Sequence, residues 1–219
     1  MNETLTLTRV TAYADVVRER HSVRQYDPNW TISESELKEI LAEASLAPSS
    51  SNTQSWRFLV FHDKELRKKL HPIANNQQQI LDSSAVVAVL GDVEGFRRMG
   101  QINDIAVEKG IMPREFADQF TERSIAMYGS LSREKQTHIA LVDGGLVSMQ
   151  LMLAAKSRGY DTVPMGGFNA ERLIEEFGIP NNLVPIMLIA VGRAASPGRP
   201  TARLPIDEIT YWNGQGLNK

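Results

Sequence analysis

The chain has 219 residues, 42% of them hydrophobic, a formal net charge of −2 and no cysteine. A chain of this length can bury a substantial core as one large domain or two small ones. The absence of cysteine excludes disulfides, thiolate metal sites and thiol nucleophiles, and the slight acidity argues against a general nucleic-acid binder. The four histidines show no metal-ligand spacing, so we expect no metal.

No targeting or membrane-spanning segment is expected. The N-terminus carries Glu3 and lacks an apolar core, unlike a secretory signal. The longest apolar runs, at 85–90 and 183–191, are too short to cross a bilayer. We therefore expect a cytoplasmic protein.

The first third of the chain predicts two helices around a basic segment. Thr8 can cap a helix that continues to about Glu19. Residues 20–24 then place two arginines, a histidine and a serine within five positions. Guanidinium groups and a hydroxyl suit a phosphate, although such a run can also be a solvated helix end. Residues 33–36 form a capping box that begins the second helix.

Apolar runs predict the strands. Residues 56–61, 85–90 and 183–191 read as strands, the last with Pro185 near an edge or a bulge. A short helix is expected from Asp63 until Pro72 stops it. A shorter extended piece, 162–168, ends in two glycines, and 206–212 is predicted to be a final extended segment.

Residues 93–130 predict two helical pieces separated near Gly110. This excursion either covers a binding site or packs at the periphery. No internal repeat or Gly-rich nucleotide fingerprint is present, so neither of the common nucleotide-binding folds is favoured.

The longest helical pattern runs from 132 to 158 and carries two apolar stripes. A helix that is apolar on two faces is expected to be buried on both. Gly144 and Gly145 lie in its interior, where each glycine costs about 1 kcal/mol relative to alanine. The pair therefore predicts a close approach by another helix, a partner subunit or a flat ligand.

The side chains favour chemistry carried by a cofactor. No nucleophile elbow is present, and the paired carboxylates occupy capping or exposed contexts. A mononucleotide flavin needs cations and a hydroxyl for its phosphate, amides and a cation at its pyrimidine edge, and a backbone N–H that only a small residue lets approach the ring. The chain contains a candidate for each need: Arg20, Ser22 and Arg203 for the phosphate; Arg24, Asn52, Gln54 and the Asn76 and Gln79 amides for the edge; and Gly166 and Gly167 for the ring.

Four segments carry a family resemblance. They are Arg-His-Ser-Val-Arg at 20–24, Ala-Pro-Ser-Ser-Ser-Asn-Thr-Gln-Ser-Trp at 47–56, Pro-Met-Gly-Gly-Phe at 164–168 and Arg-Leu-Pro at 203–205. With them the chain resembles the nitroreductase family of FMN-dependent enzymes over nearly its whole length. Ser55 stands where the family usually has proline, and Gly166 where some members carry glutamate.

The resemblance implies a set of cofactor-binding residues. The 47–56 loop would reach the flavin of the partner subunit, while Arg24 and the Gly166 backbone would give electrostatic support. No side chain is expected to act as a catalytic acid or base. The implied FMN-binding residues are Arg20, His21, Ser22, Arg24, Pro48, Ser49, Ser50, Asn52, Gln54, Asn76, Gln79, Pro164, Met165, Gly166, Gly167, Arg193 and Arg203.

The resemblance also implies a single nitroreductase-like domain over 1–219, with an α+β fold and a central, mostly antiparallel sheet flanked by helices. An intertwined homodimer would hold FMN at its interface, and 206–219 would reach the partner. The expected activity is ping-pong transfer of hydride from NADH or NADPH to nitroaromatics, quinones or similar acceptors. Other flavin chemistry and a non-catalytic FMN carrier remain open. A nucleic-acid module is disfavoured because the C-terminal arginines lack interleaved aromatics.

Overall fold

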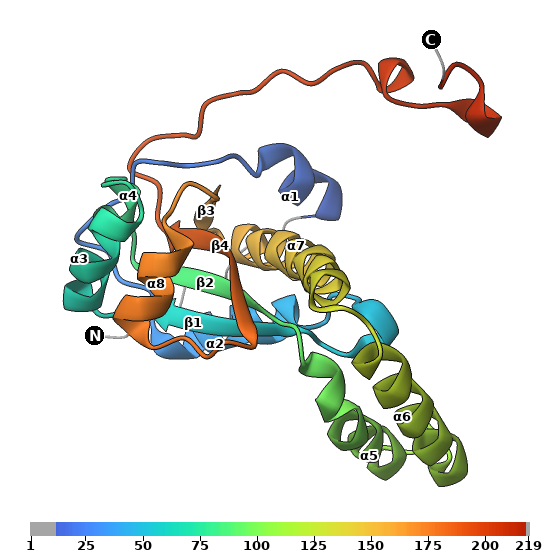
Figure 1. The fold of residues 1–219 in the computed structure, drawn as a ribbon. Coiled ribbons are helices and arrows are strands. Elements are labelled where there is room, and N and C mark those ends of the chain that lie inside the picture. The colour runs from blue at the N-terminus through green and yellow to red at the C-terminus, as the bar shows by residue number, and fades with distance from the viewer. Residues whose placement is uncertain (1–11, 218–219) are drawn as a thin grey trace, which may run out of the picture.

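A four-stranded antiparallel sheet forms the centre of the computed structural model, which describes residues 12–217 (Figure 1). The strand order is β1-β2-β4-β3, and every neighbouring pair is antiparallel. The strands are β1 (Trp56–Phe61), β2 (Ala85–Asp92), β3 (Asp161–Met165) and β4 (Leu183–Gly192). The predicted α+β class and antiparallel sheet are confirmed. The helix cap predicted at Thr8 lies outside the described residues.

Helices cover both faces of the sheet. The helices are α1 (Tyr13–Glu19), α2 (Glu34–Ala44), α3 (Lys64–Ile73), α4 (Gln79–Asp82), α5 (Met99–Glu108), α6 (Arg114–Gly129), α7 (Arg133–Ser157) and α8 (Ala170–Phe177). One core joins α3, α4 and α8 to the even-numbered side chains of β2, and the other joins α2 and α7 to the odd-numbered ones. Because strand side chains alternate between faces, β2 is apolar at nearly every position and wholly buried.

Local sequence signals set most boundaries. Ser33 and Glu36 form the predicted capping box of α2, and Asp63 caps α3 through its side chain. Pro185 pairs with Leu90 at a register shift between β2 and β4, which confirms the predicted irregularity. The prediction that Pro72 stops α3 is wrong: the proline sits inside the last turn. Ala74 there donates to the Leu70 and His71 carbonyls, and this closes the helix beyond the proline.

The long helix α7 is confirmed, but only one of its two apolar stripes is buried within the chain. The stripe that includes Ala140, Gly144 and Val147 faces the sheet, whereas Val142 and Leu146 are 62% and 43% exposed. A Cβ on Gly144 would lie 2.2 Å from the Ile186 side chain of β4, so a close approach exists there, but the sheet makes it and not a helix, partner or ligand as predicted; nothing in the described chain would lie within 4 Å of a Cβ on Gly145. By length and composition α7 could cross a membrane, but half of its most apolar window is buried inside the fold.

Two segments extend from this body. The pair α5 and α6 projects from one end of the sheet, with the turn at Gly110 (φ +68°) where the split was predicted (Figure 1). Residues 199–217, here called the C-terminal arm, run away from the body. The predicted extended segment at 206–212 is wrong, since 3-10 turns occupy Ile206–Glu208 and Trp212–Gly214. The apolar side chains of these turns are exposed, and no strand among residues 12–217 pairs with them.

Candidate functional site

Two adjoining cavities gather most of the predicted phosphate-binding side chains. The inner cavity, of about 700 Å³, is lined by Ser22, Arg24, Gln25, Gln78, Asp82, Ser196, Pro197, Gly198 and Arg199. The outer cavity, of about 600 Å³, is lined by Val17, Arg18, Arg20, His21, Ser22, Arg24, Arg199, Pro200, Thr201 and Arg203. Ser22, Arg24 and Arg199 line both, so the two hollows meet at these residues. Volumes of this size suit a small-molecule ligand.

Strand-like pairing aims the basic segment at these cavities. Ser22 forms a parallel bridge with Thr162 of β3, and the Val23 N–H donates to the Thr162 carbonyl at 3.1 Å. Val23 is buried in the core. Because side chains alternate along an extended chain, Ser22 and Arg24 on either side of Val23 turn outward. The one apolar residue of the segment thus fixes the direction of its polar neighbours.

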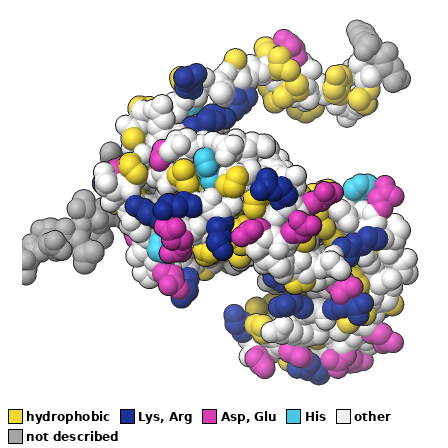
Figure 2. All heavy atoms as spheres, turned by 60° about the vertical axis from the view of Figure 1, so that its left-hand side comes forward, with side chains coloured by type: hydrophobic (Ala, Val, Ile, Leu, Met, Phe, Trp, Pro, Cys, Tyr) yellow, Lys and Arg dark blue, Asp and Glu magenta, His cyan; other side chains and the backbone are white. Residues whose placement is uncertain are grey.

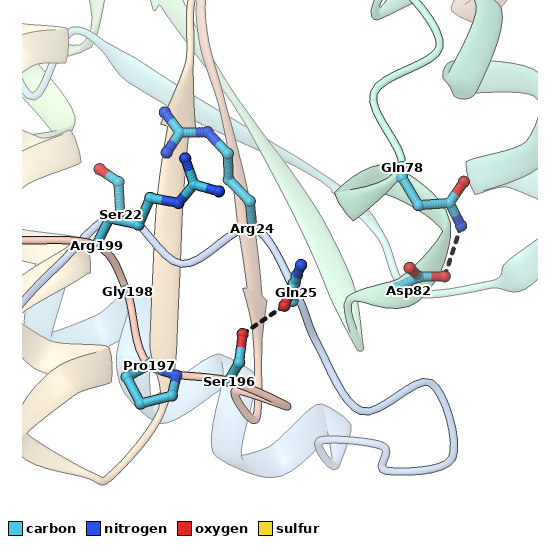
Figure 3. Close-up of a pocket in the computed structure, with 9 residues that line it drawn as sticks. All are labelled: Ser22, Arg24, Gln25, Gln78, Asp82, Ser196, Pro197, Gly198 and Arg199. Carbon is cyan, nitrogen blue, oxygen red and sulfur yellow. Dashed lines mark hydrogen bonds between the residues drawn. The ribbon is translucent and has the colours of Figure 1, made fainter.

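The cavities carry a concentrated positive charge. Five arginines line the outer cavity, whose lining contains no Asp or Glu, and none of the five forms a salt bridge within residues 12–217. Figure 3 shows the guanidinium groups of Arg24 and Arg199 pointing toward one another. The acid of the inner cavity, Asp82, lies across from them and accepts from Gln78 at 2.8 Å. Figure 2 shows the cationic side chains gathered where the C-terminal arm leaves the body. Like charges held together without an acid favour binding of an anion.

The glycine pair after β3 presents accessible backbone. Gly166 and Gly167 are exposed, and nothing would lie within 4 Å of a Cβ on Gly166. The Gly167 carbonyl accepts from the Asn75 amide at 2.9 Å and from the Gln77 amide at 3.0 Å. Two side chains therefore fix this turn while leaving the Gly166 surface open.

The two amides predicted to reach the flavin edge lie in different surroundings. Gln79 is buried and donates to Gln77 Oε1 at 3.0 Å and toward the Met165 sulfur at 3.4 Å. Asn76 is exposed in a left-handed turn (φ +53°). The structure thus gives the glycine-holding role to Asn75 and Gln77. Pro164 lies within β3, two residues before the pair.

The loop 48–54 has a strained backbone. Ser51, Asn52 and Gln54 have φ values of +48°, +56° and +48°, a region that costs residues such as Ser and Gln about 1 to 2 kcal/mol and that Asn tolerates more readily. Ser49 supports the turn, since its hydroxyl accepts from the Gln54 N–H at 3.0 Å. Pro48 and Asn52 are exposed. Such strain persists only where the surroundings hold it in place.

Two helices anchor the start of this loop. The backbone N–H and the hydroxyl of Ser50 each donate to Oδ1 of Asp143 on α7 at 3.0 Å. Asp143 is 1% exposed, and its Oδ2 has no hydrogen-bond partner within the described part of the chain. Tyr128 on α6 donates its hydroxyl to Ser51 Oγ at 2.9 Å. The loop is therefore tied both to the central helix and to the projecting α5–α6 pair.

An ion pair anchors the end of the loop. Arg57 on β1 donates to the Gln54 carbonyl at 3.1 Å and to Asp92 Oδ2 at 2.6 Å. Asp92 is buried, and its Oδ1 accepts from Asn182 at 2.9 Å. Burial lowers the pKa of the Arg57 guanidinium, the Asp92 charge raises that pKa, and the nearby Arg98 lowers it. Ser55, in the position where proline was expected, is buried and shares a 2.7 Å hydrogen bond with Thr53.

The chain brings some predicted site residues together and separates others. Arg20, His21, Ser22, Arg24 and Arg203 share the outer cavity, whereas no residue of the 48–54 loop lines either cavity. The guanidinium of Arg193 lies over the Trp30 ring, 5.5 Å from its centroid, and not among the other arginines. Arg18 and Arg199 were missed as ligand-binding candidates. The sequence shows several arginines near residue 20 and near residue 200. Only the fold shows that these two segments line the same cavity.

An antiparallel sheet with an arginine-lined cavity of about 600 Å³ at its β3 edge defines a protein suited to a phosphorylated cofactor. Comparison with known proteins makes this class specific. The family model described as "Nitroreductase family" matches residues 17–193, and the chain belongs to that family.

Several relatives cover almost the whole chain. YdgI of Bacillus subtilis, which carries the name NAD(P)H nitroreductase, is 45% identical over 91% of this chain and 97% of its own. The enone reductase of conjugated linoleic acid biosynthesis from Lactiplantibacillus plantarum is 35% identical over 87% of this chain and 89% of its own. A nitroreductase structure from Exiguobacterium sibiricum, solved in complex with FMN, has a TM-score of 0.90 and 44% identity, covering 94% of this chain and 100% of that one.

Proposed function

We propose that this protein is an FMN-dependent oxidoreductase that takes hydride from NADH or NADPH and reduces nitroaromatics, quinones or similar acceptors. The observation that carries the proposal is the meeting of Arg20, Ser22, Arg24 and Arg203 at one cavity. The FMN complex of the Exiguobacterium relative and the name of YdgI support the cofactor and the donor.

The donor set fits the phosphate of FMN. Arg20 and Arg203 offer planar guanidinium forks, and Ser22 adds a hydroxyl at the junction of the cavities. Arg203 Nη1 also donates to Thr201 Oγ1 at 2.6 Å, and this bond holds the Arg203 side chain against its own part of the C-terminal arm. These three residues would hold the phosphate, and His21 stands beside them with its Nδ1 bonded to the Glu19 carbonyl.

The remaining residues would place the ring. Arg24, in the wall shared by both cavities, would put positive charge at the pyrimidine edge. Gly166 would let the main chain lie close to the ring, because no side chain occupies the space where its Cβ would be. Bound FMN supplies the redox chemistry by accepting hydride from the nicotinamide and passing it to the acceptor. The chain itself contributes position and charge.

The loop 48–54 would complete the site from a second copy of the chain. Within one chain this loop lies apart from the cavities, yet Asn52 and Gln54 are held in a strained geometry by anchors on three elements. The partly exposed α7 stripe, which includes Val142 and Leu146, offers an apolar face for such a partner. We therefore place FMN between the subunits of a homodimer in the cytoplasm, with the projecting α5–α6 pair beside the acceptor.

The test begins with the purified protein. We expect a yellow protein that releases FMN, identified by mass, and a dimeric mass by light scattering. Initial rates with NADH and menadione should give parallel double-reciprocal lines, as a ping-pong mechanism requires. A nitroaromatic and an enone should be assayed alongside, because the relative from Lactiplantibacillus plantarum is an enone reductase. A colourless protein that does not bind added FMN would overturn the proposal.

Arg24→Ala provides the residue-level test. Loss of one charge-assisted contact should weaken FMN binding roughly tenfold or more and slow reduction by NADH. Lys69→Ala, a charge deletion on the exposed surface of α3, is the control. If Arg24→Ala keeps the flavin content and reduction rate of that control, Arg24 does not have the assigned role.

A further inference from the structure

The outer cavity holds more positive charge than one FMN phosphate needs. Five arginines line it, and the proposed function assigns Arg20 and Arg203 to the phosphate and Arg24 to the ring. Arg18 and Arg199 remain unassigned. Neither forms a salt bridge or a side-chain hydrogen bond within residues 12–217. A phosphomonoester carries at most two negative charges, so a second anionic group would be needed to balance the cavity.

The two unassigned arginines come from different segments of the chain and line the same cavity. Arg18 lies in the last turn of α1, whereas Arg199 lies at the start of the C-terminal arm. They come from segments nearly the whole chain apart, and the fold brings them to one hollow of about 600 Å³. Figure 3 shows Arg199 turned toward Arg24, a like charge, and not toward an acid. Such an arrangement is costly unless an anion lies between the groups.

We propose that the outer cavity binds the 2′-phosphate of NADPH through Arg18 and Arg199, and that the protein therefore prefers NADPH to NADH. This inference rests on the proposed function, because it concerns the donor of that reaction. In dinucleotide sites generally, a carboxylate bonds the ribose 2′-hydroxyl of NAD, whereas arginine accommodates the 2′-phosphate of NADP. The outer cavity is lined by arginine and by neither Asp nor Glu.

The surroundings also suit an adenosine. Val17 and Pro200 supply the apolar part of the lining. Tyr13 lies one turn before Val17 on α1 and is 75% exposed, so an aromatic ring is available on the same helix face for a purine to stack on.

The test compares the two donors on the FMN-loaded protein, so that NADH serves as an internal control. We expect kcat/KM to be roughly tenfold or more higher for NADPH, as a charge-assisted hydrogen bond to phosphate implies. Arg18→Ala should lower kcat/KM for NADPH about tenfold and leave the NADH value within about twofold. Arg199→Ala should show the same selective loss. Arg172→Ala, an equal charge deletion on α8 outside both cavities, should change neither donor.

A binding measurement separates recognition from turnover. By calorimetry on the same holoprotein, adenosine 2′,5′-bisphosphate should bind more tightly than adenosine 5′-monophosphate, and Arg18→Ala should abolish the difference. Equal use of both donors by the wild type would overturn the inference and leave the proposed function standing. So would an equal loss for both donors in Arg18→Ala, since the arginine would then contact the part they share. A protein without FMN that oxidises neither donor would overturn the proposed function and this inference together.

Discussion

Removal of the Asp143 carboxylate should release the loop that we assign to the flavin. One oxygen of this buried group accepts two hydrogen bonds from Ser50, each at 3.0 Å. Hydrogen bonds to a charged group contribute about 1.5 to 3 kcal/mol each, and a buried N–H left without an acceptor costs about 1 to 3 kcal/mol. Because the two bonds share one oxygen, we expect Asp143→Ala to lower the free energy of unfolding by about 2 to 5 kcal/mol.

Two further variants show how much each hydrogen bond contributes to this loss of unfolding free energy. Ser50→Ala removes one donor but keeps the backbone bond, so the loss should be about 1 to 2 kcal/mol. Asp143→Asn keeps an acceptor oxygen for Ser50 while placing an amide where Oδ2 now lies without a hydrogen-bond partner. Its loss should therefore fall between those of the other two variants. Urea unfolding of the FMN-free protein measures all three.

The functional consequence concerns the strained residues Ser51, Asn52 and Gln54. Without the Asp143 anchor these residues can relax toward ordinary backbone angles, and FMN affinity should fall at least tenfold, in the order Asp143→Ala, Asp143→Asn, Ser50→Ala. Fluorescence titration of the FMN-free proteins with FMN measures this affinity. Asp143→Ala with unchanged FMN affinity, at a temperature where it is fully folded, would refute the assigned role of the anchor.

Three other predictions follow from the packing and from the flavin. Gly144→Ala should be less stable than Gly145→Ala by about 1 to 3 kcal/mol in urea, because only the former drives a Cβ into the Ile186 side chain; equal stabilities would contradict the packing. Glu36 has a lowered pKa, chiefly because the Tyr160 hydroxyl donates to it, so it stabilises the fold above its ordinary pKa of 4.5 and loses that contribution as pH falls through the lowered value. Glu36→Gln should therefore be less stable than wild type at pH 7 and converge with it in acid, as urea midpoints at both pH values will show. Removal of FMN should lower the melting temperature of the wild type by an amount that added FMN restores, by calorimetric scanning.

Much of the fold follows from local signals that tertiary packing does not contradict. The four strand positions, the capping box at Ser33 and the split near Gly110 were all readable, because each depends on a short run of residues. The segment at 206–212 was not, since its apolar residues lack a sheet within their own chain. Alternating apolar residues indicate a face that is to be buried, but they do not show which element buries it.

The sequence indicated which residue types form the candidate site better than it indicated where they lie. Ser22, Arg24 and Arg203 share a cavity, as their chemistry suggested. The assignment of Asn76 and Gln79 to the flavin edge stays a prediction, and Asn75 and Asn76 both have left-handed backbone angles that the sequence analysis did not predict. The anchor at Asp143 had no sequence signal at all, since a single acid inside a long helix reads as a surface residue until its burial is known.

The geometry of one chain also bears on the homodimer that we propose. The arginine cavities lie along the β3 edge, whereas the strained loop precedes β1 at the opposite edge of the sheet. Strands β2 and β4 lie between these two edges of the sheet. In the homodimer that we propose, a two-fold axis would bring the first half-site of each chain to the second half-site of the other and would form two complete sites. If Asn52→Ala chains mixed with Arg24→Ala chains recover about one functional site in each mixed dimer, the halves come from different subunits; if activity does not rise above that of either variant alone, each chain builds its own site.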